Sequence, residues 1–198
     1  MQIRFFFSLF IVLSLGSCQP THKKVEHTRI FTSNKIQELR YAQLFQLEEL
    51  DNGYLLHVFS PWQDDEILAS YILYRGDLEK SEAQYPDADQ YIQIPINSYT
   101  LHSVSDIGYF KQLNSLDKLV GIADVNWVYN PQIQSLIDDD IVKNIGPSAD
   151  VNYEILQSIQ TDLYIRPAFE IDQAWKSDPR NFSINTFLNL DWKENHPL

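Results

Sequence analysis

The sequence predicts an α/β fold in which a parallel sheet is flanked by helices and preceded by a β-rich segment. Between residues 53 and 104, short runs of alternating apolar and polar residues are typical of strands. After residue 104, helical patterns of about ten residues alternate with short apolar runs, as in βαβ units with right-handed crossovers. The chain has 198 residues, 44% of them hydrophobic, and can therefore bury the core of one or at most two domains.

The β-rich part begins at "NGYLLHVFSPW", where Asn52 and Gly53 form a turn before an alternating run. The segment "SYILYR" (70–75) is the expected partner strand. The next run, "DQYIQIPINSYTLHS" (89–103), alternates again and would place Ile92, Ile94 and Ile96 on one face of a strand. The preceding residues, 19–50, are polar and mixed in charge, and strand and helix remain equally open there.

The second part reads as alternating helices and strands. A first helix over 106–119 has apolar residues at helical spacing and Ser105 or Asp106 placed to cap it. The run "LVGIAD" (119–124) is a strand, and Pro131 opens a second helix. A third helix covers 151–160, and apolar strands follow at 162–169 and 182–192. The apolar positions of the first helix are Ile107, Phe110, Leu113 and Leu116.

Glu154 lies in the first turn of the third helix, outside its apolar face. That face is formed by Val151, Ile155, Leu156 and Ile159. We therefore expect the Glu154 carboxylate to be exposed. Its interaction with the helix dipole, worth about 0.3–1 kcal/mol, would be enough to explain a glutamate there.

The N-terminus "MQIRFFFSLFIVLSLGSCQP" predicts a signal segment over residues 1–17. Arg4 is followed by an apolar run that ends at Leu15 and would span only about half of a ~30 Å hydrocarbon core. The phrase "LGSC" resembles a bacterial lipobox, which predicts lipidation of Cys18, the only cysteine; a chance cysteine is the alternative. The expected location is the cell envelope, with the lipid anchor in a membrane and the folded body facing the periplasm or the exterior.

Charge and motif patterns argue against several function classes. A formal net charge of −12 disfavours a nucleic-acid partner, because phosphate backbones bind Lys and Arg. The six glycines are not clustered, so no phosphate loop or dinucleotide fingerprint is present, and the sequence holds neither HExxH nor GxSxG. The sequence predicts no cofactor and no metal site, and "DDD" at 138–140 reads as a solvated end of a helix.

The candidate ligand-binding residues follow the expected strands. Ligands of open α/β sheets bind at the carboxyl ends of the strands. The loops at 102–108, 124–130 and 166–170 lie there and contribute aromatic and polar side chains. The candidates are Ser105, Trp127, Tyr129, Arg166 and Phe169. Core packing is the alternative role for each aromatic residue.

From Tyr99 onward the chain resembles the N-terminal lobe of the periplasmic-binding proteins of iron–siderophore and cobalamin ABC importers. The resemblance rests on "FKQLNSLDKLVGIAD", "KNIG", "NYEIL" and "TDLYI", which follow the family's order and spacing over roughly 70 residues. Thr161 departs from the pattern, since the family has Pro before the Asp. The resemblance implies a Rossmann-like lobe of a class III solute-binding protein over 51–198, with 51–98 as its β-rich start and 18–50 as a tether.

The resemblance also implies roles and partners. The family docks on its membrane permease through a lobe-tip glutamate, and the matching "N-x-E" phrase places this role on Glu154. The cargo would be an iron chelate or a corrinoid, with Arg166 facing an acidic chelate. The chain resembles one lobe without the linking helix and the C-terminal lobe, which implies weak ligand binding by this chain alone.

Two other function classes stay open. A surface lipoprotein could use the same fold for scaffolding or adhesion without transport. A hydrolase using His102 and Asp106 is disfavoured, because four residues of loop do not fix a catalytic geometry. The sequence therefore predicts a binding protein and not an enzyme.

Overall fold

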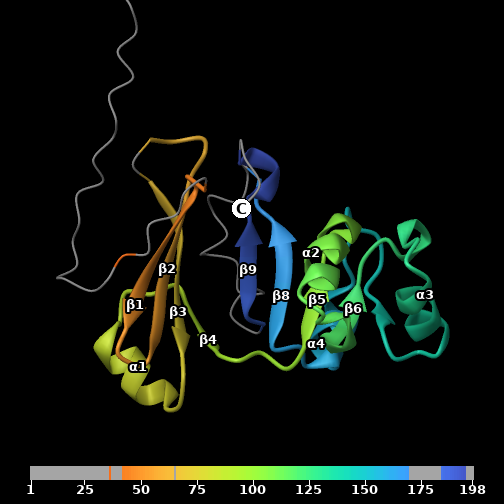
Figure 1. Cartoon of the computed structure of the whole chain (residues 1–198), viewed down its shortest axis with the longest axis horizontal. Helices are drawn as coiled ribbons and strands as arrows, with labels where there is room; N and C mark the ends of the chain where they lie inside the picture. The colour runs from red at the N-terminus through yellow and green to blue at the C-terminus, as the bar shows by residue number, and fades with distance from the viewer. Residues whose placement is uncertain (1–35, 37–41, 65, 170–183, 195–198) are drawn as a thin grey trace, which may run out of the picture.

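The computed structural model describes residues 36, 42–64, 66–169 and 184–194. The predicted signal segment, Cys18 and most of the tether lie outside the described residues. Within them the chain forms two sheets, placed side by side in Figure 1. None of the helices in the described ranges is long and apolar enough to cross a membrane.

The first sheet has the order β1-β2-β3-β4. Strands β1 (Phe45–Leu50), β2 (Gly53–Phe59) and β3 (Ile67–Tyr74) are antiparallel, and β4 (Gln90–Gln93) returns parallel to β3 after helix α1 (Leu78–Gln84). The turn between β1 and β2 requires glycine at position 53, because a Cβ there would lie 1.8 Å from the carbonyl oxygen of Leu73. The β-rich start is confirmed, and β1 shows that the end of the 18–50 segment is a strand.

The run containing Ile92, Ile94 and Ile96 is not one strand, so that prediction is wrong. Strand β4 ends at Gln93, the Ile94–Pro95 bond is cis, and the next strand starts at Tyr99 in the other sheet. Pro95 has no N–H to donate to a ladder, so the alternating pattern is interrupted where the chain crosses between sheets. Only Ile92 of the three isoleucines is fully buried.

The second sheet is parallel throughout, with the order β7-β6-β5-β8-β9. Its strands are β5 (Tyr99–Leu101), β6 (Leu119–Ile122), β7 (Lys143–Asn144), β8 (Leu163–Pro167) and β9 (Thr186–Asn189). This confirms an α/β fold with a parallel sheet flanked by helices. The strand order reverses between β5 and β8, and in such sheets a crevice opens above the carboxyl ends of the two strands at the reversal.

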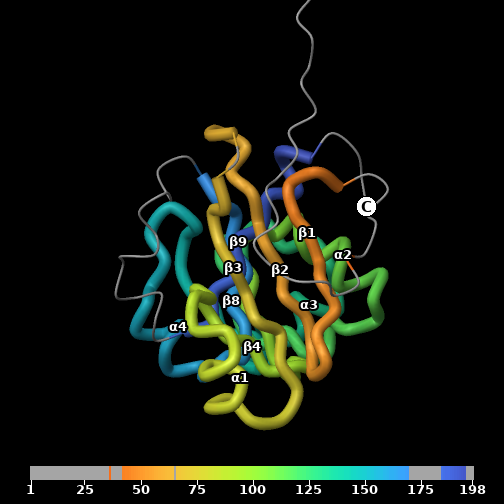
Figure 2. The backbone as a smooth tube through the Cα atoms, turned by 90° about the vertical axis from the view of Figure 1, so that its left-hand side faces the viewer, coloured from red at the N-terminus to blue at the C-terminus, as the bar shows by residue number. Residues whose placement is uncertain are grey.

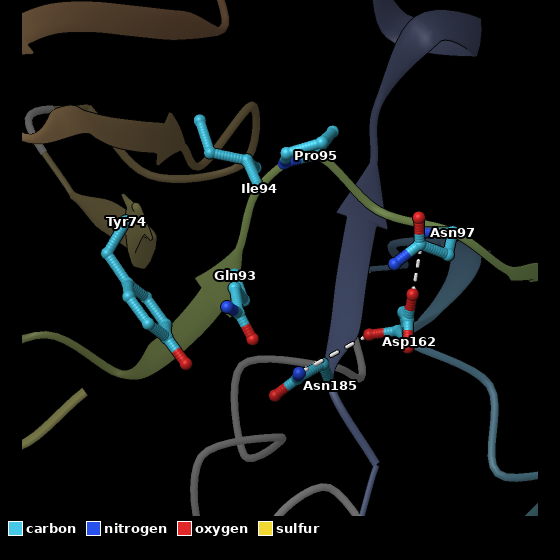
Figure 3. Close-up of a pocket in the computed structure, with 7 residues that line it drawn as sticks. All are labelled: Tyr74, Gln93, Ile94, Pro95, Asn97, Asp162 and Asn185. Carbon is cyan, nitrogen blue, oxygen red and sulfur yellow. Dashed lines mark hydrogen bonds between the residues drawn. The ribbon is translucent and has the colours of Figure 1, made fainter. Parts of the chain in front are cut away.

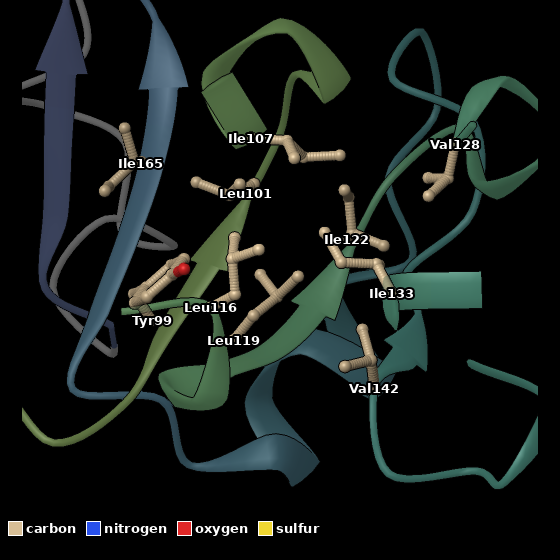
Figure 4. Packing of buried hydrophobic residues seen from close by; sticks show 10 residues of the cluster. All are labelled: Tyr99, Leu101, Ile107, Leu116, Leu119, Ile122, Val128, Ile133, Val142 and Ile165. Atoms are coloured by element: carbon tan, nitrogen blue, oxygen red, sulfur yellow. The ribbon is translucent and has the colours of Figure 1, made fainter. Parts of the chain in front are cut away.

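Helices cover both faces of the second sheet. Helices α2 (Ile107–Gln112) and α3 (Pro131–Asp138) pack on one face, and α4 (Tyr153–Ile159) packs on the other. Alternation along the strands separates the two cores, since Ile165 faces α2 and α3 whereas Tyr164 faces α4. Figure 4 shows the first core, formed by Tyr99, Leu101, Ile107, Leu116, Leu119, Ile122, Val128, Ile133, Val142 and Ile165.

Strand β9 is the edge of the second sheet, and the first sheet covers it. The Leu188 N–H donates to the Tyr71 hydroxyl at 3.0 Å, and the Thr186 N–H donates to Gln90 Oε1 at 2.7 Å. A buried edge strand needs such partners for its outward N–H groups. Figures 1 and 2 agree in placing β3 against β9, and the two sheets therefore share one core.

A polar pocket of about 350 Å³ lies where β4 crosses to β5, at the amino ends of β5, β8 and β9 (Figure 3). There Asp162 Oδ2 accepts the N–H groups of Asn97 at 2.6 Å and Ser98 at 3.1 Å, and the Asp162 N–H donates to Ser98 Oγ at 2.9 Å. These bonds fix the entry into β8. The polar groups of this pocket thus hold strand ends in place.

The first helix is shorter than the sequence predicts. α2 ends at Gln112, because Asn114 has a left-handed φ of 51° that closes the turn, and Leu113 is 70% exposed. The cap also differs, since Ser103 accepts the Ser105 N–H and Asp106 makes no capping bond. The third helix follows its pattern: Asn152 caps it, Leu156 is fully buried and Gln160 ends it in a left-handed conformation.

Candidate functional site at the carboxyl edge of the parallel sheet

An open pocket of about 520 Å³ lies beyond the carboxyl ends of β5 and β6. It brings together three of the five residues proposed from the sequence, Ser105, Trp127 and Tyr129. The remaining lining residues come from the same two loops and were not singled out in the sequence. The pocket is lined by Val104, Ser105, Ile107, Gly108, Trp127, Tyr129 and Asn130.

The loop after β6 holds its two aromatic residues on a fixed backbone. Asp124 has a left-handed φ of 53°, and its carbonyl accepts the Trp127 N–H at 2.8 Å. Val128, between the two aromatic residues, is buried in the core. Asn130 then caps α3 by accepting the N–H groups of Gln132 and Ile133. The Trp127 and Tyr129 side chains are consequently 63% and 75% exposed on a rigid support.

Asp124 also ties this loop to the next one. Its Oδ1 accepts the Ser148 N–H at 3.0 Å. Hydrogen bonds from the side chain and backbone of Ser148 lower the pKa of Asp124, and the charge of His102 adds to this effect. The carboxyl is therefore ionised at neutral pH and contributes a fixed negative charge at the base of the Trp127 loop.

The exposed aromatic side chains gather at one edge of the molecule. Every aromatic residue in the described ranges that is exposed follows the carboxyl end of a strand of the second sheet. Large exposed aromatic surface is unusual in a soluble domain unless something binds there. These residues are Tyr109, Trp127, Tyr129, Phe169 and Trp192.

Phe169 belongs to a second aromatic group beside the pocket and not to its lining. Its ring centroid lies 5.9 Å from that of Trp192, which in turn is 6.4 Å from Trp62 in the β2–β3 loop. Lys193 Nζ lies 4.7 Å from the Trp192 ring centroid, within cation–π range. The carboxyl edge therefore carries two aromatic groups. Of the second group, only Phe169 was proposed from the sequence.

Arg166 is not in the pocket either. It lies on β8 with the same parity as Tyr164, so it faces away from Ile165 and from the α2 and α3 side where the pocket opens. Burial raises the pKa of the Tyr71 and Tyr164 hydroxyls, and the positive charge of Arg166 partly opposes this for both. The structure therefore places Arg166 outside this pocket, and its role toward a ligand stays a prediction.

Asp106 lies between two pocket residues but turns away from the pocket. Its side chain is only 2% exposed, and Oδ1 accepts from Asn189 Nδ2 at 3.4 Å. Its Oδ2 has no hydrogen-bond partner within the described part of the chain. Burial, together with the smaller effect of the nearby Asp191 carboxylate, raises the pKa of Asp106 to about 6. Asp191 also accepts the Tyr109 hydroxyl at 3.0 Å, which links α2 to the segment after β9.

His102 engages a different set of groups. Its Nδ1 lies 2.6 Å from the Tyr164 hydroxyl, a hydrogen bond that joins β5 and β8 on the α4 side of the sheet. Asp106 instead contacts Asn189 on the other side. The two residues of the hydrolase alternative thus have separate hydrogen-bond partners.

Glu154 is exposed at the amino end of α4, as expected from the helix pattern. Asn152 Oδ1 accepts its N–H at 3.1 Å, so the first turn is fixed and the carboxylate points to solvent. The helix follows β7, which places Glu154 at the same carboxyl edge as the aromatic groups. Both the docking role and the helix-dipole role are compatible with this position.

No protein family and no curated protein sequence matches this chain. The described residues hold no group of three or more His, Cys, Asp or Glu side chains arranged to bind a metal ion. The chemistry available at the pocket is thus stacking, apolar contact and a few hydrogen bonds, as in a binding site for a solute.

Proposed function

We propose that this chain is the substrate-binding lipoprotein of an ABC importer, with an iron–siderophore or corrinoid cargo. The observation that carries the proposal is the aromatic pocket at the carboxyl edge of a parallel sheet, formed by the loops of β5 and β6. It lies next to the strand-order reversal, where α/β sheets bind their ligands. The resemblance of residues 99–165 to the N-terminal lobe of class III solute-binding proteins supports the same function.

In this proposal Trp127 and Tyr129 stack on the cargo, and Ser105 hydrogen bonds to it. Glu154 docks on arginines of the permease, because it is exposed and held on a rigid helix end. Cys18 carries the lipid, which keeps the folded body at the membrane face of the envelope.

A tryptophan fluorescence titration of the purified lipoprotein tests the cargo. We expect weak but saturable quenching by a ferric siderophore or a corrinoid when the titration is carried to roughly millimolar cargo, because a single lobe buries only part of the ligand. Trp127→Ala, followed by calorimetry because the substitution removes a fluorescent residue, should weaken binding by roughly tenfold, since one stacking face is lost. Leu113→Ala is the matched control, because Leu113 is also exposed and lies outside the pocket lining. If neither cargo class gives a saturable signal or a calorimetric heat, the proposal is wrong.

Docking is tested separately by transport in proteoliposomes that contain the cognate permease. Glu154→Gln should abolish most stimulation of ATP hydrolysis while changing the free energy of unfolding by less than about 1 kcal/mol. Glu79→Gln, another exposed first-turn glutamate at the start of α1, is the control that should leave stimulation unchanged. Equal stimulation by the wild type and Glu154→Gln would leave only the helix-dipole role.

The second candidate is a surface lipoprotein that binds a macromolecule without transport. The second aromatic group favours it, because Phe169, Trp192 and Trp62 extend the aromatic surface beyond the pocket. A large partner would contact both groups. Loss of binding to that partner in both Trp127→Ala and Trp192→Ala, with no small-molecule binding, would support this candidate over import.

A further inference from the structure

We infer that the pocket accepts a solute with apolar surface that is neutral or positively charged and discriminates against multiply charged anions. This inference rests on the proposed function and narrows its cargo. It follows from the side chains that line the pocket and from the charges placed around it.

The lining itself carries no charged side chain. Two exposed aromatic rings and several apolar groups form most of the surface, and only Ser105 and Asn130 offer polar side chains. The Asn130 Oδ1 is already used by the N–H groups of Gln132 and Ile133. A ligand is therefore held mainly by its apolar surface. An anionic ligand would leave its hydration without receiving a cationic partner in the lining.

Several carboxylates lie on the segments that carry the lining residues. Asp106 lies between the lining residues Ser105 and Ile107, and the ionised Asp124 begins the turn that carries Trp127. Asp191 follows on the same edge and is hydrogen bonded to Tyr109. The whole chain also carries a formal net charge of −12. The surrounding field therefore attracts cations to this edge.

The basic side chains on these segments lie outside the lining, and they include the exposed Lys111, one turn after Gly108 on α2. Arg166 faces the opposite side of β8, and Lys193 lies over the Trp192 ring in the second aromatic group. The exposed faces of Trp127 and Tyr129 can themselves attract a cationic ligand through their ring electrons. One carboxylate about 10 Å from a ligand charge changes the affinity by roughly two- to twentyfold, depending on the local dielectric constant.

Three probes that differ in charge test the inference by calorimetry and tryptophan fluorescence. They are a cationic ferric trihydroxamate bearing a free amine, a neutral corrinoid and a triply anionic ferric tris-catecholate. We expect the first two to bind and the third to bind at least roughly tenfold more weakly at low salt. The difference should shrink as salt is added, because screening weakens the carboxylate field.

Gly108 offers a direct way to invert this preference. It lines the pocket at the start of α2, is exposed, and a Cβ added there would meet no atom within 4 Å. Gly108→Lys should therefore fold and raise the affinity for the tris-catecholate by roughly tenfold. Gly108→Glu should raise the affinity for the cationic trihydroxamate instead. Gly108→Ala is the steric control and should leave the order of the three probes unchanged.

The outcomes separate this inference from the proposed function. Equal or tighter binding of the tris-catecholate by the wild type would overturn the charge preference while leaving a solute-binding role intact. A lack of response to Gly108→Lys and Gly108→Glu would also overturn it, since the charge would then not be sensed at the pocket. If none of the three probes binds any variant, the proposed function itself fails.

Discussion

Replacement of Asp106 by asparagine should stabilise the protein above neutral pH and remove part of its pH dependence. Asp106 is buried, its Oδ2 is unpartnered within the described residues, and burial raises its pKa from 3.8 to about 6. Between these two values the folded protein holds a proton that the unfolded chain has lost. The contribution of Asp106 to stability is therefore present below about pH 3.8 and is lost as the pH rises to about 6.

The pKa values set the size of the effect. The shift of the Asp106 pKa from 3.8 to about 6 corresponds to a loss of at most about 3 kcal/mol in the free energy of unfolding. Screening by nearby water reduces the expected loss to about 1–3 kcal/mol. An asparagine amide is uncharged, so it avoids this cost. It can also donate an N–H toward the Asp191 carboxylate while its oxygen still accepts from Asn189.

Urea denaturation at a series of pH values measures the prediction. We expect Asp106→Asn to exceed the wild type in the free energy of unfolding by about 1–3 kcal/mol near pH 8 and to match it near pH 4. The contributions of the other titrating groups to the pH dependence of stability cancel when the two proteins are subtracted. Asp191→Asn, which keeps Asp106 but removes its charged neighbour, should move the titration midpoint to lower pH. A difference between wild type and Asp106→Asn that is constant from about pH 4 to pH 8 would refute the argument.

Two further predictions concern the packing that holds the sheet. Tyr71→Phe should lower the free energy of unfolding in urea by about 1–3 kcal/mol, because it leaves the buried Leu188 N–H without an acceptor while retaining the ring. Tyr91→Phe removes a half-buried hydrogen bond to the Tyr85 carbonyl and should cost less. Equal costs for the two variants would show that burial of the Leu188 N–H adds nothing to the cost of losing the bond. In thermal unfolding, Gly121→Ala should lower the melting temperature, whereas Gly108→Ala should raise it. A Cβ at 121 would lie 2.9 Å from Ile159 Cδ1 and 3.0 Å from Thr100 Cγ2, which costs about 1–2 kcal/mol, whereas a Cβ at 108 meets nothing and gains about 0.5–1 kcal/mol of helix propensity. Destabilisation by both would contradict the packing described here.

The alternating helices and strands of the second sheet could be predicted because each helix has a clear apolar face. Helix α4 is the best case, since the spacing of its apolar residues predicted the buried Leu156 and the exposed Glu154. The 89–103 run was misread because its alternation continues across Pro95, which marks the crossing between sheets. Strand β1, "FQLEEL", could not be assigned from its pattern, because its burial depends on pairing with β2.

The loops of the candidate site could be predicted, but the direction in which each side chain points could not always be predicted. Ser105, Trp127 and Tyr129 meet because β5 and β6 are adjacent and parallel. Arg166 does not line the pocket, and strand parity contains the reason: Ile165 is the core residue facing α2 and α3, so Arg166 faces the other side of the sheet. Phe169 lies one strand further along the edge, and its partner Trp192 follows β9, whose position depends on the first sheet.

The Asp106 carboxylate underlies both the loss of stability above about pH 6 and part of the proposed charge preference of the pocket. A buried carboxyl that lowers stability above pH 6 is unfavourable for folding alone, and such positions are often retained for function. Ser105 and Ile107 on either side of Asp106 line the pocket, so in the proposed function the charge of this buried carboxyl would act near the ligand. A cationic ligand would offset part of the cost of ionised Asp106, which links binding to protonation. Asp106→Asn should consequently move stability and cationic ligand affinity in opposite directions, whereas a purely structural role for this carboxyl would change stability alone.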